Sequence, residues 1–178
     1  VPGLTEQLST GIKMMDLGCG SGKIINTLAA LYPNTLFTGI DLSEEAISKA
    51  RLEARGMGLS NVTYIVRDLS DFHVTAPREA YDLITTFDAI HDQGKPLNVL
   101  KGIYRALKND GIYLMQDISG SSHLNEDKKH PIAPFLYTIS CMHCMTVSLA
   151  QDGEGLGAMW GEEITRDYLS NAGFTSIK

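Results

Sequence analysis

Short apolar runs alternate with amphipathic stretches along most of the chain. Residues 12–18 (IKMMDLG) have the apolar pattern of a buried strand, and residues 24–33 (IINTLAALYP) repeat apolar positions at helical spacing before a proline. Further strands are predicted at residues 36–41, 61–68, 81–90 and 111–118, and further helices at residues 44–56 and 96–108. Strands that alternate with helices are typical of a parallel sheet covered on both faces.

Two short signals set expected ends of these elements. Ser43, followed by Glu44 and Glu45, is typical of the capped start of a helix. Residues 109–111 (Asn-Asp-Gly) are typical of a turn, so we expect the fifth strand to begin after it.

The alternation breaks after the fifth predicted strand. Residues 119–160 contain a polar loop, an apolar stretch and a glycine-rich stretch, so we expect a helical insertion or cap there. Residues 162–172 return to an amphipathic helical pattern, and a last short strand is predicted at residues 174–178. We therefore predict one domain over residues 1–178, with its core over residues 12–118.

Length and composition fit one globular domain. The chain has 178 residues, a formal net charge of −6 and a pI near 5.3, without a run of Lys or Arg. This charge gives no general attraction to a phosphate backbone, so we expect no nucleic-acid partner for this domain. Residues 134–149 are the longest apolar stretch and are short for a membrane span, and no signal peptide opens the chain. Three cysteines are an odd number and a poor basis for a disulfide framework, which favours a reducing compartment. We therefore expect a cytoplasmic protein without a membrane partner.

Residues 16–22 (DLGCGSG) place an acid and three evenly spaced glycines at the end of the first strand. A dinucleotide fingerprint reads G-x-G-x-x-G, whereas here single residues separate the glycines and Lys23 stands at the place of the third one. The phosphate-binding pattern G-x-x-x-x-G-K-[ST] fails at both of its ends. Asp16 also disfavours a phosphate ligand, because it places a negative charge next to the turn.

An acid beside a glycine turn suits a ligand that carries an ammonium group. Glycines let the backbone approach closely, and the Asp16 carboxylate can hold the cation by a charge-assisted contact. Asp41, at the end of the second strand, is placed to accept both hydroxyls of a ribose. Asp68, at the end of the third strand, can accept from an adenine amino group. Ammonium, ribose and adenine together describe S-adenosylmethionine.

At these motifs the chain resembles the class I S-adenosylmethionine-dependent methyltransferases. The resemblance covers residues 12–118 and includes DLGCGSG, GIDLS, VRDL and FDAIHD. It implies an α/β fold with a Rossmann-like, doubly wound, mostly parallel sheet, with S-adenosylmethionine as cofactor and S-adenosylhomocysteine as product. The cofactor-binding residues expected from the acid, the glycine turn and the family pattern are Asp16, Gly18, Cys19, Gly20, Gly22, Asp41, Leu42, Asp68, Leu69 and Asp88.

The family pattern divides these residues by the part of the cofactor that they would contact. It implies that residues 18–20 surround the methionine part and that residues 41–42 hold the ribose and adenine. Residues 68–69 would flank the adenine, and Asp88 would lie near the amino-acid end.

A narrower resemblance covers nearly the whole chain. GIKMMDLGCGSG, FDAIHDQGKP, HPIAPFLYTISCMHCMTVSLA and GLGAMWG together resemble uncharacterised methyltransferases whose N-terminus carries a winged-helix domain. It implies such a domain before Val1 and, after the last helix, an antiparallel pair whose final strand inserts into the sheet. The sequence printed contains neither, so we expect a fold truncated at the C-terminal hairpin.

His91 and Asp92 are the candidate catalytic residues. A protein assists methyl transfer mainly by positioning, and by a base when the nucleophile is protonated. His91 follows the fourth strand, where small-molecule O-methyltransferases commonly place a base, and Asp92 can orient it. A histidine held in a loop by hydrogen bonds is an equally good interpretation.

The insertion offers candidates for a substrate pocket and for a metal site. Tyr137, His143 and Trp160 can line an acceptor pocket or belong to the core. Cys141, His143 and Cys144 have the chemistry of soft-metal ligands. On one helix, however, the two cysteines would share a face while the histidine points elsewhere, and a fourth ligand is absent. We therefore expect no metal site and cysteines that act as small buried apolar residues.

The sequence favours a methyltransferase that acts on a small-molecule acceptor. The fourth strand is followed by FDAI, without the motifs that resemble those of DNA amino-methyltransferases. The alternative is a regulatory module that binds the cofactor without turnover and works with the winged-helix domain. A nicotinamide-dependent oxidoreductase is disfavoured by the glycine spacing. The methylated atom and the oligomeric state, including a dimer, stay open.

Overall fold

The computed structural model describes residues 2–178, which form two compact units. The first unit contains residues 2–68, Pro77–Phe87 and Ala106–Met115. The second unit contains Leu69–Ala76, Asp88–Arg105 and Gln116–Lys178. Each unit is therefore built from segments that are distant in the sequence.

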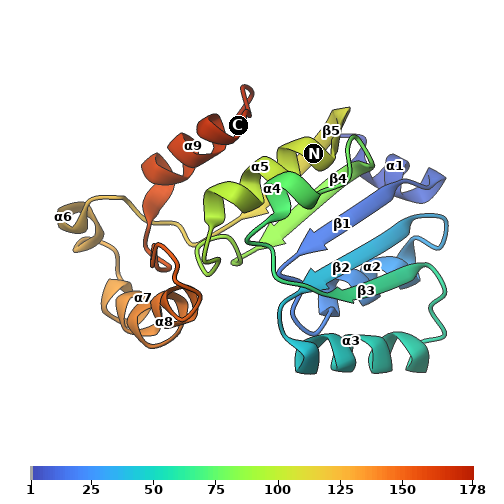
Figure 1. Ribbon diagram of the computed structural model, residues 1–178, viewed down its shortest axis with the longest axis horizontal. Coiled ribbons are helices and arrows are strands. Elements are labelled where there is room, and N and C mark those ends of the chain that lie inside the picture. Colours follow the sequence, from blue (N-terminus) through green and yellow to red (C-terminus); the bar gives the residue numbers. More distant parts are fainter. Residues whose placement is uncertain (1) are drawn as a thin grey trace. The chain divides into compact units, whose positions relative to one another are not determined.

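The first unit carries a five-stranded sheet with the order β3-β2-β1-β4-β5 (Figure 1). Its strands are β1 (Lys13–Leu17), β2 (Leu36–Asp41), β3 (Val62–Val66), β4 (Tyr81–Phe87) and β5 (Leu107–Gln116, whose last residue belongs to the second unit). The pairs β1–β2, β1–β4 and β2–β3 are parallel. The order reverses beside β1, which makes the sheet doubly wound and confirms the predicted Rossmann-like α/β fold.

Three helices belong to the first unit: α1 (Leu4–Thr10), α2 (Lys23–Leu31) and α3 (Glu44–Gly56). α2 and α3 pack against β2 and β3 and against each other. The predicted cap of α3 is confirmed, because the Ser43 Oγ accepts a hydrogen bond from the Ala46 N–H at 3.2 Å. The core of this unit is apolar and consists of Leu8, Met14, Ile25, Ala29, Phe37, Ile47, Ala50, Ala54, Tyr64 and Leu83.

The second unit is helical. Its elements are α4 (Phe72–Thr75), α5 (Pro96–Ala106, whose last residue belongs to the first unit), α6 (Leu124–Asp127), α7 (Ala133–Ile139), the π-helical turn η1 (Ser140–Cys144), α8 (Met145–Leu149) and α9 (Gly161–Ala172). α4 packs directly on α5, because a Cβ at Gly102 would collide with the Phe72 ring. Within residues 2–178, no helix combines the length and the apolar character needed to cross a membrane.

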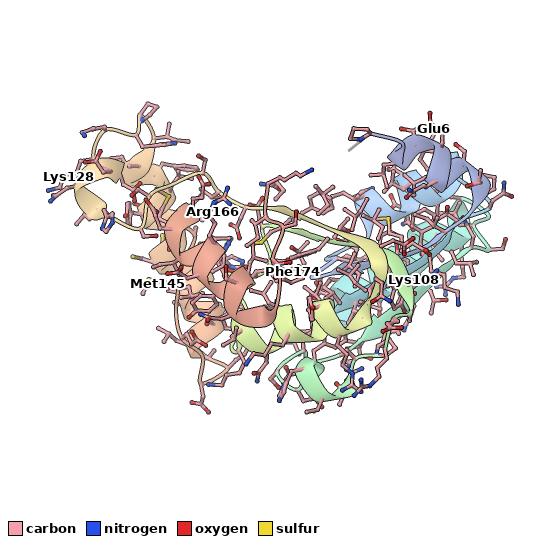
Figure 2. All side chains as sticks on the ribbon, turned by 90° about the horizontal axis from the view of Figure 1, so that it is seen from above. Glu6, Lys108, Lys128, Met145, Arg166 and Phe174 are labelled. Atoms are coloured by element: carbon pink, nitrogen blue, oxygen red, sulfur yellow. The ribbon has the colours of Figure 1, made fainter. Side chains whose placement is uncertain are left out.

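The last predicted strand is wrong. α9 ends at Gly173, whose φ of 114° is in the left-handed region, and residues 174–178 have no regular secondary structure. The ring of Phe174, labelled in Figure 2, packs edge-on against the ring of Tyr104 at 5.3 Å between centroids. Phe174, the apolar residue on which the strand prediction rested, is thus packed against α5 instead of lying in a sheet. Among the described residues, the segment pairs with no strand.

The turn predicted at residues 109–111 is also wrong, since β5 begins already at Leu107. A turn of this sequence type usually needs a positive φ, and none of these three residues has one. The start of the strand is instead fixed by Lys108, labelled in Figure 2, whose ammonium donates to the Asp82 Oδ1 at 2.6 Å. The Ala80 N–H also donates to the Ala106 carbonyl at 2.8 Å, which brings the chain beside β4 before the glycine is reached.

Candidate functional site

The glycine turn lies between β1 and α2 and is tied to the end of β2. Gly18, Gly20 and Gly22 have φ values of 72°, 53° and 72°, a region that glycine enters without a steric penalty. The N–H groups of Gly18 and Cys19 both donate to the Ile40 carbonyl, at 2.8 and 3.1 Å. The evenly spaced glycines therefore let the backbone curl tightly at the carboxyl end of β1.

Asp41 joins the glycine turn to the start of α3. Its Oδ2 accepts the Gly20 N–H at 2.8 Å and its Oδ1 accepts the Ser43 N–H at 2.8 Å. An ionised carboxylate offers about four lone-pair sites, so both oxygens can still accept from a further donor. The next side chain, Leu42, is 53% exposed, which places an apolar surface beside the carboxylate.

The glycines at the two ends of this turn differ in their surroundings. A Cβ added at Gly20 would meet no protein atom within 4 Å. A Cβ added at Gly22 would collide with the Tyr64 hydroxyl and with Ala50. Gly22 is thus required for packing, whereas the space beside Gly20 is open to a ligand.

Asp16 lies inside β1, opposite Gly39 of β2 and Thr85 of β4. It is 3% exposed, and its Oδ1 accepts a hydrogen bond from the Thr85 hydroxyl at 2.7 Å. Burial raises the pKa of Asp16 to about 7, the Thr85 hydrogen bond lowers it, and the Asp41 charge raises it further. A cation bound beside this group would favour its ionised form.

Cys19 lies in the glycine turn, where the charges of Asp16 and Asp41 both act on it, and is partly buried. Burial and the charges of Asp16 and Asp41 raise the pKa of its thiol. The thiolate is the nucleophilic form of cysteine, so Cys19 is not an activated nucleophile here.

The remaining expected cofactor residues are divided between the units. Asp68 is exposed and lies two residues beyond the end of β3, in the first unit. Leu69 is 4% exposed and Asp88 is exposed, and both belong to the second unit. The structure thus brings Asp16, the glycine turn and Asp41 together, whereas Leu69 and Asp88 are described only within their own unit.

Asp88 has an unusual backbone conformation for a non-glycine residue, with a φ of 47°. Its N–H donates to the Gln116 carbonyl at 3.0 Å, and its Oδ1 accepts from the Gln116 side chain at 3.1 Å. Burial and the Asp117 charge raise the pKa of Asp88. Left-handed non-glycine residues are held by their surroundings and are frequent at functional sites.

His91 is buried between two carboxylates of the second unit. Its Nδ1 lies 2.7 Å from Oδ1 of Asp117, and its Nε2 lies 3.4 Å from Oδ1 of Asp92. An ionised carboxylate can only accept a hydrogen bond, so Nδ1 carries a proton and its N–H donates a hydrogen bond to Asp117. Burial lowers the pKa of His91, but the hydrogen bond to Asp117 and the charges of Asp117, Asp92 and Asp88 outweigh it, so the pKa is raised. Asp117, rather than Asp92, orients the ring.

Cys144 of η1 faces the same two residues. One ligand atom each of His91, Asp92 and Cys144 lie within 4.8 Å of one another. Burial and the neighbouring Asp92 carboxylate raise the pKa of the Cys144 thiol to about 12. The expectation that the two cysteines share a helical face is wrong, because Cys141 is exposed and Cys144 is 5% exposed. They lie in a π-helical turn, whose wider i→i+5 spacing changes the face on which each residue falls.

The three residues expected to line a substrate pocket have different partners. The Tyr137 hydroxyl donates to Oδ2 of the buried Asp127 at 2.7 Å. The His143 Nε2 lies 3.9 Å from Oδ2 of Asp92. Trp160 is 3% exposed and its ring packs edge-on against Tyr168, with 5.7 Å between centroids.

Three residues of these sites were missed by the sequence-based prediction. Asp41 is the last residue of β2 and Asp117 directly follows β5, so the same signal, an acid at a strand end, marks Asp117. Thr85, the partner of Asp16, gives no signal beyond being a polar residue in an apolar strand. Tyr64 supports Gly22 from β3: its hydroxyl lies 2.7 Å from the Asn26 Oδ1 and 3.2 Å from the Gly22 carbonyl oxygen.

Known proteins match the chain over most of its length. The protein family described as methyltransferase domain matches residues 8–168. The ubiquinone biosynthesis O-methyltransferase of Glaesserella parasuis serovar 5 is 30% identical over 112 residues, which are 61% of this chain and 46% of that protein. The chain therefore spans about half the length of the curated relatives it matches.

Solved structures share the fold. The YcgJ protein of Bacillus subtilis is similar with a TM-score of 0.71 at 18% identity, over 95% of this chain and 64% of that one. A methyltransferase of Geobacter sulfurreducens, solved in complex with S-adenosyl-L-homocysteine, gives a TM-score of 0.53 at 28% identity over 64% of this chain and 44% of that one. The chain belongs to the methyltransferase-domain family, whose class I members use S-adenosylmethionine as methyl donor.

Proposed function

We propose that this protein binds S-adenosylmethionine in the first unit and transfers its methyl group to a small-molecule acceptor. The observation that carries the proposal is the hydrogen bond of 2.8 Å between the Gly20 N–H and the Asp41 carboxylate. It places a carboxylate with free lone pairs beside a glycine that has open space around it. A nucleoside attached to an amino acid needs both features within a few ångströms.

Each part of the cofactor has a residue of matching chemistry. The buried Asp16 carboxylate suits the ammonium group, and the backbone of residues 18–20 suits the methionine chain. Asp41 suits the ribose hydroxyls, and the exposed Leu42 suits one face of the adenine. Asp68 remains the proposed acceptor for the adenine amino group, while the roles of Leu69 and Asp88 stay predictions.

A small molecule with a hydroxyl group is the proposed acceptor class. This choice is supported by the curated relatives, which are O-methyltransferases of ubiquinone biosynthesis. His91 stays the candidate group on the acceptor side, with Nε2 as its available nitrogen because Asp117 occupies Nδ1. Positioning of the acceptor and removal of its proton are the two contributions that methyl transfer requires.

Calorimetric titration with S-adenosylmethionine, S-adenosylhomocysteine and NADH tests the cofactor. We expect micromolar binding of the first two, weakened by at least about 10-fold in Asp41→Ala, which removes roughly 1.4 kcal/mol or more of contact free energy. Glu44→Gln is the matched control, because this exposed acid lies three residues away in the first turn of α3. Binding of NADH alone, or equal loss in both variants, would refute the proposed cofactor site.

A second measurement separates an enzyme from a module that only binds the cofactor. Labelled S-adenosylmethionine is incubated with a panel of phenols, catechols and other hydroxyl compounds, and methylated products are detected by mass spectrometry. Product formation above the rate without protein supports the enzyme. Tight cofactor binding without any product over the whole panel would favour the regulatory alternative.

A further inference from the structure

Three side chains with metal-binding chemistry converge in the second unit. His91 and Asp92 come from the loop after β4, and Cys144 comes from η1 in the insertion. One ligand atom from each lies within 4.8 Å of the other two. Imidazole, carboxylate and thiolate are the ligand types that zinc uses in proteins.

The His91 ring is already oriented as a metal ligand is. Its Nδ1 donates to Asp117 at 2.7 Å, which leaves Nε2 without a proton in the neutral ring and directed toward Asp92. Metal-ligating histidines almost always donate their other ring N–H to a carboxylate or carbonyl group, which fixes the tautomer. Asp117 is held in turn by the Ile118 N–H, which donates to its Oδ1 at 2.8 Å.

The Asp92 carboxylate has an oxygen that needs a positive partner. Within residues 2–178, Asp92 Oδ1 is buried and accepts no hydrogen bond. It faces Nε2 of His91 at 3.4 Å, so with a neutral ring two lone pairs point at each other, and either a proton on Nε2 or a bound cation must lie between them. An unpaired buried carboxylate oxygen is costly, and a bound cation removes that cost.

Cys144 is held in place by the structure around η1. Ser140, the first residue of this turn, accepts the Ala158 N–H through its Oγ at 2.9 Å, which ties the glycine-rich stretch to the insertion. Cys144 is 5% exposed, whereas Cys141, in the same turn, is exposed. π-helical turns are rare and are frequent at functional sites.

We propose that His91 Nε2, Asp92 Oδ1 and Cys144 Sγ bind a zinc ion, with the fourth position open to water or to an acceptor heteroatom. Zinc bonds of about 2.0–2.3 Å place tetrahedral ligand atoms roughly 3.3–3.8 Å apart. The three ligand atoms lie within 4.8 Å of one another, so side-chain movements of about 1 Å bring them to these tetrahedral distances. Three protein ligands with an open fourth position are typical of catalytic rather than structural zinc.

This site revises the expectation of no metal, which considered only ligands within one helix. Cys141 and His143 are not members, although the His143 Nε2 lies 3.9 Å from the second oxygen of Asp92. Any part of the zinc ion in methyl transfer rests on the proposed function. With Nε2 coordinated, His91 would act as a ligand instead of as a base, and a Lewis acid at the open position would lower the pKa of a bound hydroxyl. Metal binding itself does not rest on that function.

The test uses zinc and cobalt alone, without cofactor or acceptor. Chelator-treated protein in a thiol-free reducing buffer is titrated with Zn²⁺ against a chromophoric competitor, and with Co²⁺ while the absorption spectrum is recorded. We expect one ion per chain, tetrahedral cobalt bands in the visible range and a thiolate-to-cobalt band in the near ultraviolet. Cys144→Ser should lose the thiolate band and weaken zinc binding by about 100-fold or more, while the matched control Cys141→Ser keeps both.

The outcomes decide between zinc and a proton shared by His91 and Asp92. Absence of stoichiometric binding by folded wild-type protein, or loss of the thiolate band in Cys141→Ser but not in Cys144→Ser, overturns the site. Should Cys144→Ser fail to fold, the double variant Cys19→Ser, Cys141→Ser keeps Cys144 as the last of the three thiols. A near-ultraviolet cobalt band in this variant supports the site, and its absence overturns it. S-adenosylmethionine binding, measured separately in the first unit's variants, is unaffected by either result, so the two proposals fail independently.

Discussion

The His91 Nδ1 lies 2.7 Å from the Asp117 Oδ1, in a pair that joins the loop after β4 to the end of β5. The histidine side chain is 2% exposed and the aspartate side chain 10% exposed, so water competes little for this hydrogen bond. The pair fixes which ring nitrogen carries the proton. Every role considered for His91 therefore depends on Asp117.

Replacement of Asp117 by asparagine should release the tautomer of His91. An asparagine amide can either donate or accept, so Nδ1 is no longer forced to carry the proton. We expect the Nε2–H tautomer to become populated, as seen in multiple-bond ¹⁵N–¹H spectra of the imidazole, and zinc affinity to fall by about 10- to 100-fold. Asp110→Asn removes an exposed charge from β5, the strand that precedes Asp117, and should change neither quantity. Equal spectra for the wild type and Asp117→Asn would contradict this role.

Asp16 should make the first unit less stable as the pH rises. The folded state raises its pKa from 3.8 to about 7, mainly by burial, so the folded protein holds this proton more tightly than the unfolded chain does. The free energy of unfolding therefore falls as the pH rises from about 4 to about 7 and is lowest above pH 7. The total loss is up to about 4 kcal/mol for a pKa shift of about 3.

Urea unfolding of Asp16→Asn against the wild type checks this effect. Asparagine cannot ionise and can still accept the Thr85 hydrogen bond, so the variant should gain stability over the wild type above pH about 7 and lose the advantage near pH about 4. A difference in the free energy of unfolding that is constant across this range would show that Asp16 does not titrate as described.

Binding of S-adenosylmethionine should release a proton from Asp16. The ammonium group would favour the ionised carboxylate and lower its pKa, which is about 7 in the free protein. Calorimetry near pH about 6.5 in two buffers of different ionisation enthalpy should give binding enthalpies that differ in proportion to the protons released. Asp16→Asn should bind more weakly and give the same enthalpy in both buffers, and a wild-type enthalpy independent of the buffer would place the ammonium elsewhere.

The sequence predicts the sheet well because its signals are local. The bounds of β2 agree with the predicted residues 36–41, and Ser43 caps α3 as expected. The errors at residues 109–111 and 174–178 come from tertiary contacts, of Lys108 with Asp82 and of Phe174 with Tyr104, which override the local preference.

The candidate sites divide in the same way. The glycine turn and Asp41 lie close in sequence to the strands that position them, so their spacing identifies them. The His91–Cys144 cluster joins distant segments through a π-helical turn, and a pattern search that assumes ordinary helical spacing places Cys144 on the wrong face. Asp117 could have been found, because it too follows a strand.

Gly20→Ala and Gly22→Ala should separate a glycine that faces a ligand from one that is needed for packing. Both have a positive φ, of 53° and 72°, so each alanine costs about 1–2 kcal/mol of backbone strain. At Gly22 the methyl group also collides with Tyr64 and Ala50, and we expect an additional loss of stability of about 1–3 kcal/mol, measured by urea unfolding. At Gly20 the methyl group meets no protein atom, so any further effect must fall on a ligand. We expect S-adenosylmethionine affinity to drop by at least about 10-fold in Gly20→Ala while the fold stays cooperative, and unchanged affinity would mean that the cofactor does not approach this side of the turn.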